Sequence, residues 1–120
     1  MILFKTIYDV YEYNAKLIRV IDGDTIDASI DLGFDVWVKK RIRLHGIDAP
    51  ESRTRDLEEK KRGIASTEFL RTLMEANNGD FIVRSEGVGK YGRCLGVIII
   101  AGDNINDKLI KEGHAKEYMK

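Results

Sequence analysis

Three runs of alternating apolar and polar residues, separated by two short turns, restrict the fold more than any other feature of the sequence. The first run is predicted as a strand over 6–21, with a polar interruption at 12–16, and the others cover 25–32 and 36–44. Alternation of this kind, rich in β-branched residues, is typical of half-buried strands. Asp22-Gly23-Asp24 predicts a tight turn that uses the tolerance of glycine for positive φ, and Leu32-Gly33-Phe34-Asp35 predicts a hairpin turn. Three strands joined by such turns form a meander.

The second half of the chain alternates between helical and strand patterns. Residues 51–62 are almost free of apolar side chains and are predicted as a solvated loop that runs into a helix over 64–77. Short strand patterns follow at 81–83 and 94–101, separated by a flexible turn at 86–89. A last short helix is predicted over 105–112, with Asn104 as its N-cap and Gly113 as its stop.

This order of elements predicts a mainly β (α+β) fold. Strands and helices do not alternate as βαβ units, which disfavours a doubly wound parallel sheet. The pattern fits an OB-fold, a five-stranded antiparallel Greek-key barrel with an amphipathic helix between strands three and four and a short C-terminal helix. We expect residues 1–120 to form a single domain, with Phe69, Leu73 and Val97 in its core.

The charge of the chain is balanced overall but uneven along its length. Residues 1–36 carry three basic and seven acidic residues, residues 37–62 carry nine and five, and residues 63–120 carry eight of each, so the net charge is zero. A polyanion can therefore be attracted locally, but the general basic excess of a strong nonspecific nucleic-acid binder is absent. We expect any affinity for nucleic acid to be modest and sensitive to salt.

Composition also limits the location and the metal chemistry. No apolar run approaches the roughly 20 residues of a membrane span, and the start of the chain lacks the order of a signal peptide. We therefore expect a cytoplasmic protein without membrane contact, or a secreted one if a signal has been removed, and a monomer in either case. Cys94 is the only cysteine and begins an apolar run, so it is interpreted as a core residue. Isolated His45 and His114 disfavour zinc.

Carboxylates and arginines gather in three short stretches. Asp22 and Asp24 bracket a glycine, while Asp48 and Glu51 flank Pro50, which stiffens the second turn. Oxygen ligands of this kind suit Ca²⁺ or Mg²⁺. Each feature alone is consistent with an ordinary turn or a solvated arginine, but carboxylates, a hard metal and arginines at 43 and 93 are together the groups that phosphodiester hydrolysis needs.

The same stretches carry a family resemblance. Val20-Ile-Asp-Gly-Asp-Thr25, Arg41-Ile-Arg-Leu-His-Gly-Ile-Asp-Ala-Pro-Glu51 and Lys90-Tyr-Gly-Arg-Cys-Leu-Gly96 resemble, in order and spacing, the three signature blocks of the staphylococcal nuclease family. The resemblance covers roughly residues 15–118. It implies an OB-fold and Ca²⁺-dependent hydrolysis of DNA and RNA, with single strands favoured and 3′-phosphates left behind.

By position, the resemblance also implies a role for each residue. The implied metal site consists of Asp24, Asp48 and the carbonyl of Ala49, with Asp22 in its outer shell. The implied catalytic residues are Arg43 and Arg93 at the scissile phosphate and Glu51 at the attacking water. The implied substrate contacts are Lys90, Tyr91 and Tyr118. The chain departs from the best-known secreted member of the family in its neutral charge, and it ends without that member's further C-terminal helix.

Two other functions fit parts of the pattern. A nuclease-like OB module that binds nucleic acid or protein without cutting would share the fold but would not need all five of Asp24, Arg43, Asp48, Glu51 and Arg93. A small Ca²⁺-stabilised structural domain would explain the carboxylates and leave the arginines unexplained. The sequence favours the nuclease, because these groups together serve phosphoryl chemistry.

Overall fold

The computed structural model describes residues 11–118, apart from the side chain of Tyr91. Its helical elements are α2 (Leu57–Glu75), the short 3₁₀ turn η1 (Lys90–Gly92) and α3 (Ile105–Lys111). Its strands are β1 (Glu12–Asp22), β2 (Thr25–Asp31), β3 (Trp37–Leu44), β4 (Ile47–Asp48), β5 (Asp80–Val88), β6 (Cys94–Ile100), β7 (Asp103–Asn104) and β8 (Lys116–Glu117). Among the described residues, no helix is both long enough and apolar enough to cross a bilayer. The predicted beginning of the first strand, at 6–10, lies outside the described residues.

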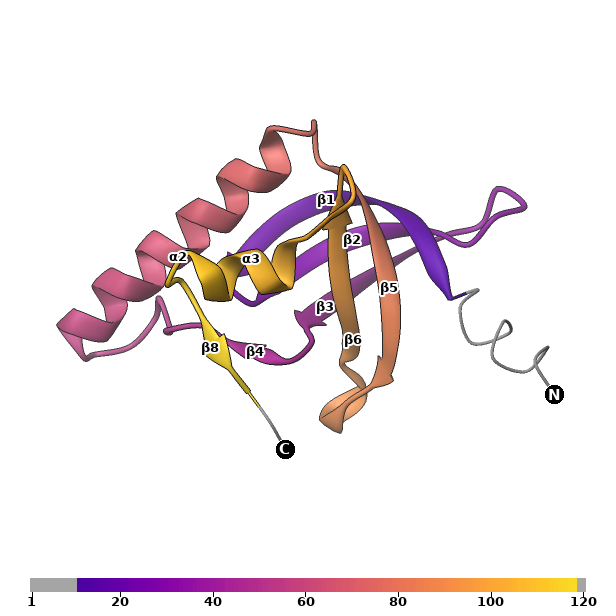
Figure 1. The fold of residues 1–120 in the computed structure, drawn as a ribbon. Helices are drawn as coiled ribbons and strands as arrows, with labels where there is room; N and C mark the ends of the chain where they lie inside the picture. The colour runs from indigo at the N-terminus through magenta and orange to yellow at the C-terminus, as the bar shows by residue number, and fades with distance from the viewer. Residues whose placement is uncertain (1–10, 119–120) are drawn as a thin grey trace, which may run out of the picture.

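Five strands close into a barrel, as the OB-fold prediction requires. The sheet order is β3-β2-β1-β5-β6-β7, and an additional β3–β6 pairing joins the two sides (Figure 1). The other barrel pairings are antiparallel, but β3 and β6 run parallel, with Arg43 opposite Leu95. The wholly antiparallel barrel of the prediction therefore differs from the structure in this one pairing, because β6 returns from β5 in the direction that β3 already follows.

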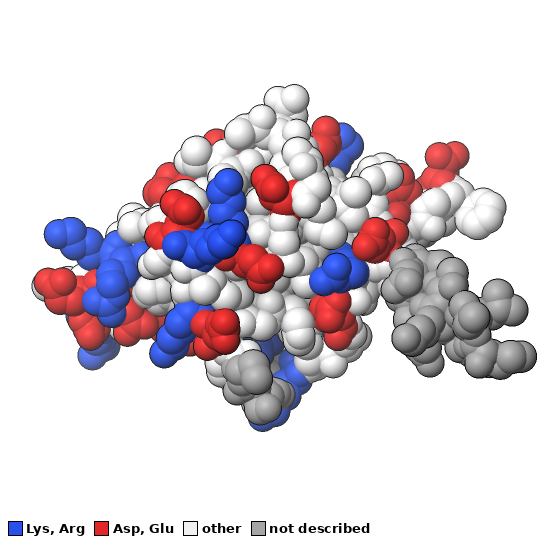
Figure 2. Space-filling model, viewed as in Figure 1, with Lys and Arg blue, Asp and Glu red and all other residues white. Residues whose placement is uncertain are grey.

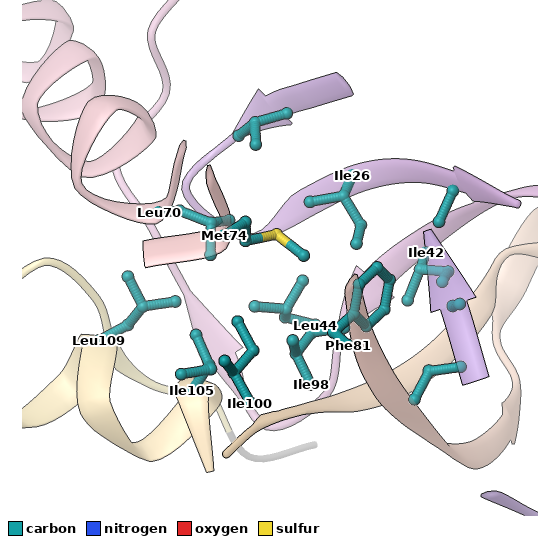
Figure 3. Close-up of a cluster of buried hydrophobic side chains, with 14 of the residues drawn as sticks. Ile26, Ile42, Leu44, Leu70, Met74, Phe81, Ile98, Ile100, Ile105 and Leu109 are labelled. Carbon is teal, nitrogen blue, oxygen red and sulfur yellow. The ribbon is translucent and has the colours of Figure 1, made fainter. Parts of the chain in front are cut away.

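The core fills the barrel interior and the space beneath the helices (Figure 3). Ile26, Ile42 and Ile98 come from three different barrel strands and are at most 1% exposed. Leu70 and Met74 of α2 and Leu109 of α3 close the same cluster. Val97 is buried as predicted, whereas Phe69 and Leu73 are only partly buried against the core. Phe69 instead stacks on the ring of His114, with 4.3 Å between the ring centroids.

The helix α2 begins seven residues before the predicted start. Its N-cap is Asp56, whose carboxylate accepts hydrogen bonds from the backbone N–H groups of Glu58 and Glu59. Its first turns are polar and exposed, so they lack the apolar periodicity on which the prediction depended. Its buried face includes the small residues Gly63, Ser66 and Thr67, which lets the helix lie very close to the loops beneath it.

The strand β5 is also longer than predicted. It continues to Val88 through a register irregularity between Ser85 and Val88, and Gly87 adopts a φ of 105° there. Because of this bulge, β5 stays paired with β6 across a stretch that was predicted, from its glycines, to be a flexible turn. By contrast, α3 begins as predicted, with the side chain of Asn104 accepting a hydrogen bond from Asp107 N–H at 3.0 Å.

Candidate active site

A cleft of about 470 Å³ lies where the β1–β2 turn, the end of β3 and the η1 loop meet. Nine of the ten site residues predicted from the sequence line it, and for the tenth, Tyr91, the side chain lies outside the described part. The nine are Asp22, Asp24, Arg43, Asp48, Ala49, Glu51, Lys90, Arg93 and Tyr118. The fold therefore brings together stretches that are up to 96 positions apart, counted from Asp22 to Tyr118.

The turn that presents the first carboxylates depends on close packing. Gly23 does not have a positive φ, so the prediction about its conformation is wrong. A Cβ at this position would lie 2.7 Å from the Cβ of Ser66 and 3.0 Å from the Cβ of Ala49. Glycine is required because α2 and the Ala49 segment press on the turn from two sides. The turn is thereby fixed relative to both.

Asp24 is held at the back of the cleft by hydrogen bonds to both of its oxygens. The residue is 8% exposed. Its Oδ2 accepts from the backbone N–H of Ala49 at 2.9 Å, and its Oδ1 accepts from the hydroxyl of Thr25 at 2.9 Å. Sequence reasoning gave Thr25 no role, although the residue directly follows Asp24 in the first block. Asp22 lies nearer the rim, where its carboxylate accepts a hydrogen bond from Ser52.

Arg43 occupies the centre of the site. Because Ile42 and Leu44 are buried, strand alternation turns Arg43 to the outer side of the barrel, as predicted. Its Nη1 donates to the carbonyls of Leu44 at 3.1 Å and Ile47 at 2.9 Å. The same guanidinium lies 3.5 Å from Oδ2 of Asp24 and 3.5 Å from Oδ1 of Asp48. Arg43 is thus oriented by two carbonyls and faces both carboxylates.

Glu51 is positioned by its backbone and not by its side chain. The residue is exposed, and its N–H donates to Oε2 of Glu59 at 3.2 Å. A Cβ on Gly63 would lie 2.3 Å from the carbonyl oxygen of Glu51, so α2 touches this segment directly. Glu51 lines the cleft, and α2 holds its backbone from behind.

Lys90, Arg93 and Tyr118 form the outer wall of the cleft. Lys90 and Arg93 lie at the two ends of the η1 turn, and both are exposed. Tyr118 is half exposed, and its N–H donates to the carbonyl of Gly46 at 2.9 Å, which extends the β4–β8 pairing. Cationic and aromatic groups therefore line the same cleft as the carboxylates.

The buried Asn106 also supports the site, and sequence reasoning did not find it. Its Oδ1 accepts from Ile98 N–H, and its amide nitrogen donates to the carbonyls of His45 and Gly96. The residue is 2% exposed and fixes the loop that follows Arg43. An asparagine in a short amphipathic helix carries no sequence signal for such a role.

The donor set fits a hard divalent cation that water would help to ligate. Asp24, Asp48 and the carbonyl of Ala49 are oxygen donors of the kind that Ca²⁺ prefers. Within residues 11–118, no three His, Cys, Asp or Glu side chains converge closely enough to form a metal cluster. Ca²⁺ takes six to eight oxygen ligands and accepts backbone oxygens and waters among them, so two carboxylates and one carbonyl make a suitable partial shell.

Comparison with known sequences places the chain in a family. The family described as "Staphylococcal nuclease homologue" matches residues 41–120, two thirds of the chain. The chain therefore belongs to the staphylococcal nuclease homologues, and its barrel is the OB-fold of that family.

Individual relatives agree with this assignment. The chain is 35% identical to Endonuclease YhcR of Bacillus subtilis over 116 residues, which cover 89% of this chain and 9% of that protein. It is 35% identical to the thermonuclease of Staphylococcus intermedius, with 82% of this chain and 55% of that protein covered. The micrococcal nuclease of Shigella flexneri is 29% identical, with 89% and 59% covered. The chain spans less than two thirds of the length of each of these relatives.

Proposed function

We propose that the protein is a Ca²⁺-dependent nuclease that hydrolyses phosphodiester bonds of DNA or RNA and leaves 3′-phosphates. The single observation that carries the proposal is the position of Arg43, which two carbonyls aim at Asp24 and Asp48 in the cleft that Glu51 and Arg93 also line. The names of the relatives, endonuclease, thermonuclease and micrococcal nuclease, support the same activity.

In the proposed mechanism, the chain's own side chains bind the phosphate and activate the attacking water. Arg43 and Arg93 donate hydrogen bonds to the non-bridging phosphoryl oxygens and stabilise the charge that grows there. Glu51 accepts a proton from the attacking water as the new P–O bond forms. The P–O5′ bond breaks, a solvent water protonates the departing 5′ oxygen, and the phosphate stays on the 3′ side. Ca²⁺, held by Asp24, Asp48 and the Ala49 carbonyl, would supply further charge neutralisation at the phosphoryl group.

The proposal is tested by digestion of single-stranded and duplex DNA in Ca²⁺ and in excess EGTA. Wild-type protein should cut only with Ca²⁺, and Glu51→Gln should lower the rate by roughly 10²- to 10⁴-fold, as for loss of a general base. Glu75→Gln, an exposed change at the far end of α2, is the matched control and should cut normally. Absence of cutting by wild-type protein, together with salt-sensitive binding of DNA, would instead support the non-catalytic binding module.

A further inference from the structure

The outward face of β3 carries a row of basic and aromatic side chains that ends at Arg43. Val38, Ile42 and Leu44 turn toward the barrel interior, so Trp37, Lys39, Arg41 and Arg43 share the opposite face. Trp37, Lys39 and Arg41 are exposed. We call these three residues the β3 strip.

Arg41, the residue of the β3 strip nearest the cleft, is held by the carboxylate of Asp27. Asp27 of β2 lies opposite Arg41 in register and also opposite Arg19 of β1. Its Oδ1 accepts from Nε of Arg41 at 2.8 Å, and its Oδ2 accepts from Nε of Arg19 at 2.9 Å. The hydrogen bond to Arg41, and with it that to Arg19, lowers the pKa of the Asp27 carboxyl. Two guanidinium groups are thus held in place by one carboxylate, with an excess of one positive charge.

The next two outward-facing positions of β3 carry a lysine and an aromatic ring. Lys39 lies opposite Ser29, which is itself opposite Lys16 of β1. Trp37 lies opposite Asp31 at the base of the β2–β3 hairpin, which projects beyond the barrel in Figure 1. The ring is half exposed and is the only tryptophan of the chain. It lies six positions from Arg43, roughly 20 Å along a strand.

We propose that the β3 strip binds the part of a single-stranded polynucleotide that extends out of the cleft, with phosphates at Arg41 and Lys39 and a base stacked on Trp37. The proposal rests on the nuclease function proposed above for its assignment of the scissile phosphate to the cleft. Alternate residues on a strand are roughly 7 Å apart, which is comparable to the spacing of phosphates in an extended single strand.

The chemistry of the strip favours a single strand over a duplex. Basic grooves combined with aromatic rings bind single strands because unpaired bases can stack on the rings, and such stacking is insensitive to sequence. A duplex offers phosphates but no free base for Trp37. On the face shown in Figure 2, basic and acidic side chains lie among one another and neither sign forms a continuous patch. Binding of a strand must therefore depend on local groups such as the β3 strip.

Fluorescence of Trp37 tests the proposal directly. Oligothymidylate of about ten nucleotides, within the usual range for one OB-fold, is titrated into the Glu51→Gln variant in EGTA, so that the strand is not cut. The thymidine dinucleotide, and a duplex as long as the oligothymidylate, are titrated in parallel. We expect the long single strand to quench Trp37, and the dinucleotide and the duplex to leave its emission almost unchanged.

Variants test whether the single strand binds to the outward face of β3. Lys39→Ala and Arg41→Ala should each weaken binding severalfold and lower the salt slope, log K against log salt, by about 0.7. Trp37→Leu, followed by anisotropy of a labelled strand, should weaken binding roughly five- to hundredfold. Lys40→Ala is the matched control, since it removes the same charge from the same strand but Lys40 lines the apolar cavity on the inner side. It should bind like the parent.

Two results would overturn the proposal: equal losses for Lys39→Ala and Lys40→Ala, or equal quenching by the duplex and the single strand. Either failure can be told apart from failure of the nuclease function. If wild-type protein cuts DNA but the strip variants bind normally, only the strip is wrong. If wild-type protein cuts nothing and the strip variants still lose affinity, only the nuclease function is wrong.

Discussion

Arg43 is the residue whose replacement should separate catalysis from folding most cleanly. It donates to two backbone carbonyls and faces two carboxylates at once, and its fixed fork of donors suits this arrangement better than a single ammonium group. Arg43→Lys should therefore lower the rate of DNA hydrolysis by about 10²-fold, as for loss of a charge-stabilising donor. The rate is measured under single turnover. Arg71→Lys, a change at a partly exposed arginine of α2, is the control, and equal rates for the two variants would contradict the assigned role.

Asp27 carries a prediction about acid stability. Its neighbours Arg41 and Arg19 lower the pKa of its carboxyl below the ordinary 3.8. A lowered pKa in the folded state stabilises the fold fully above pH 3.8 and loses that contribution as the pH falls through the lowered value. Asp27→Asn should consequently unfold at a lower temperature at pH 7, while the difference from wild type should shrink as the pH falls below 3.8 and through the lowered pKa. Thermal unfolding across this range, with Asp35→Asn as the control, measures both.

Residues within short contiguous blocks were predictable, and residues that act through tertiary contact were not. Asp24, Arg43, Asp48 and Glu51 were all predicted to share a site, and the structure gathers them in one cleft. The role of Gly23 was predicted for the wrong reason, because its close contact with Ser66 comes from a helix more than forty residues later. Nothing local in the sequence indicates that contact.

At the scale of elements, the barrel strands were identified by alternation, and the errors occur where tertiary pairing overrides local composition. β5 continues through Gly87 because its partner β6 holds it. The polar beginning of α2 is helical because Asp56 caps it, not because it buries an apolar face. The parallel pairing of β3 with β6 is a property of barrel closure, which strand patterns do not encode.

Gly63 gives a prediction for α2 as an element. In an exposed helix, replacing glycine by alanine usually stabilises by about 1 kcal/mol. Here the added methyl group would lie 2.3 Å from the carbonyl oxygen of Glu51, so Gly63→Ala should destabilise by roughly 1–3 kcal/mol and also reduce activity by displacing Glu51. Ala65→Gly on the exposed side of the same helix should cost about 1 kcal/mol and leave activity intact. Denaturant unfolding and a cleavage assay compare them, and a stabilised Gly63→Ala would show that α2 does not clamp the loop.

For the whole molecule, metal binding should be measurable as a rise in the unfolding temperature Tm. The chain is neutral overall, so a cation gains little from the molecule's general field and must bind through local oxygen donors. An ion that binds only the folded state at a hundredfold excess over its Kd stabilises by about 2.7 kcal/mol, which for a domain of this size raises Tm by on the order of 10 °C. Ca²⁺ should therefore raise Tm in wild-type protein, and EGTA should reverse the rise.

Asp48→Asn should remove most of that rise, because it deletes one of the two carboxylates that are proposed to hold Ca²⁺ and that face Arg43. Asp103→Asn, at an exposed position of β7, should preserve the rise. Scanning calorimetry of the three proteins across Ca²⁺ concentrations measures the shift without any cleavage assay. Equal shifts in all three would place the ion away from Asp48. If Asp48→Asn loses the shift and also loses hydrolysis, the metal site and the cleft that Arg43 faces are the same site.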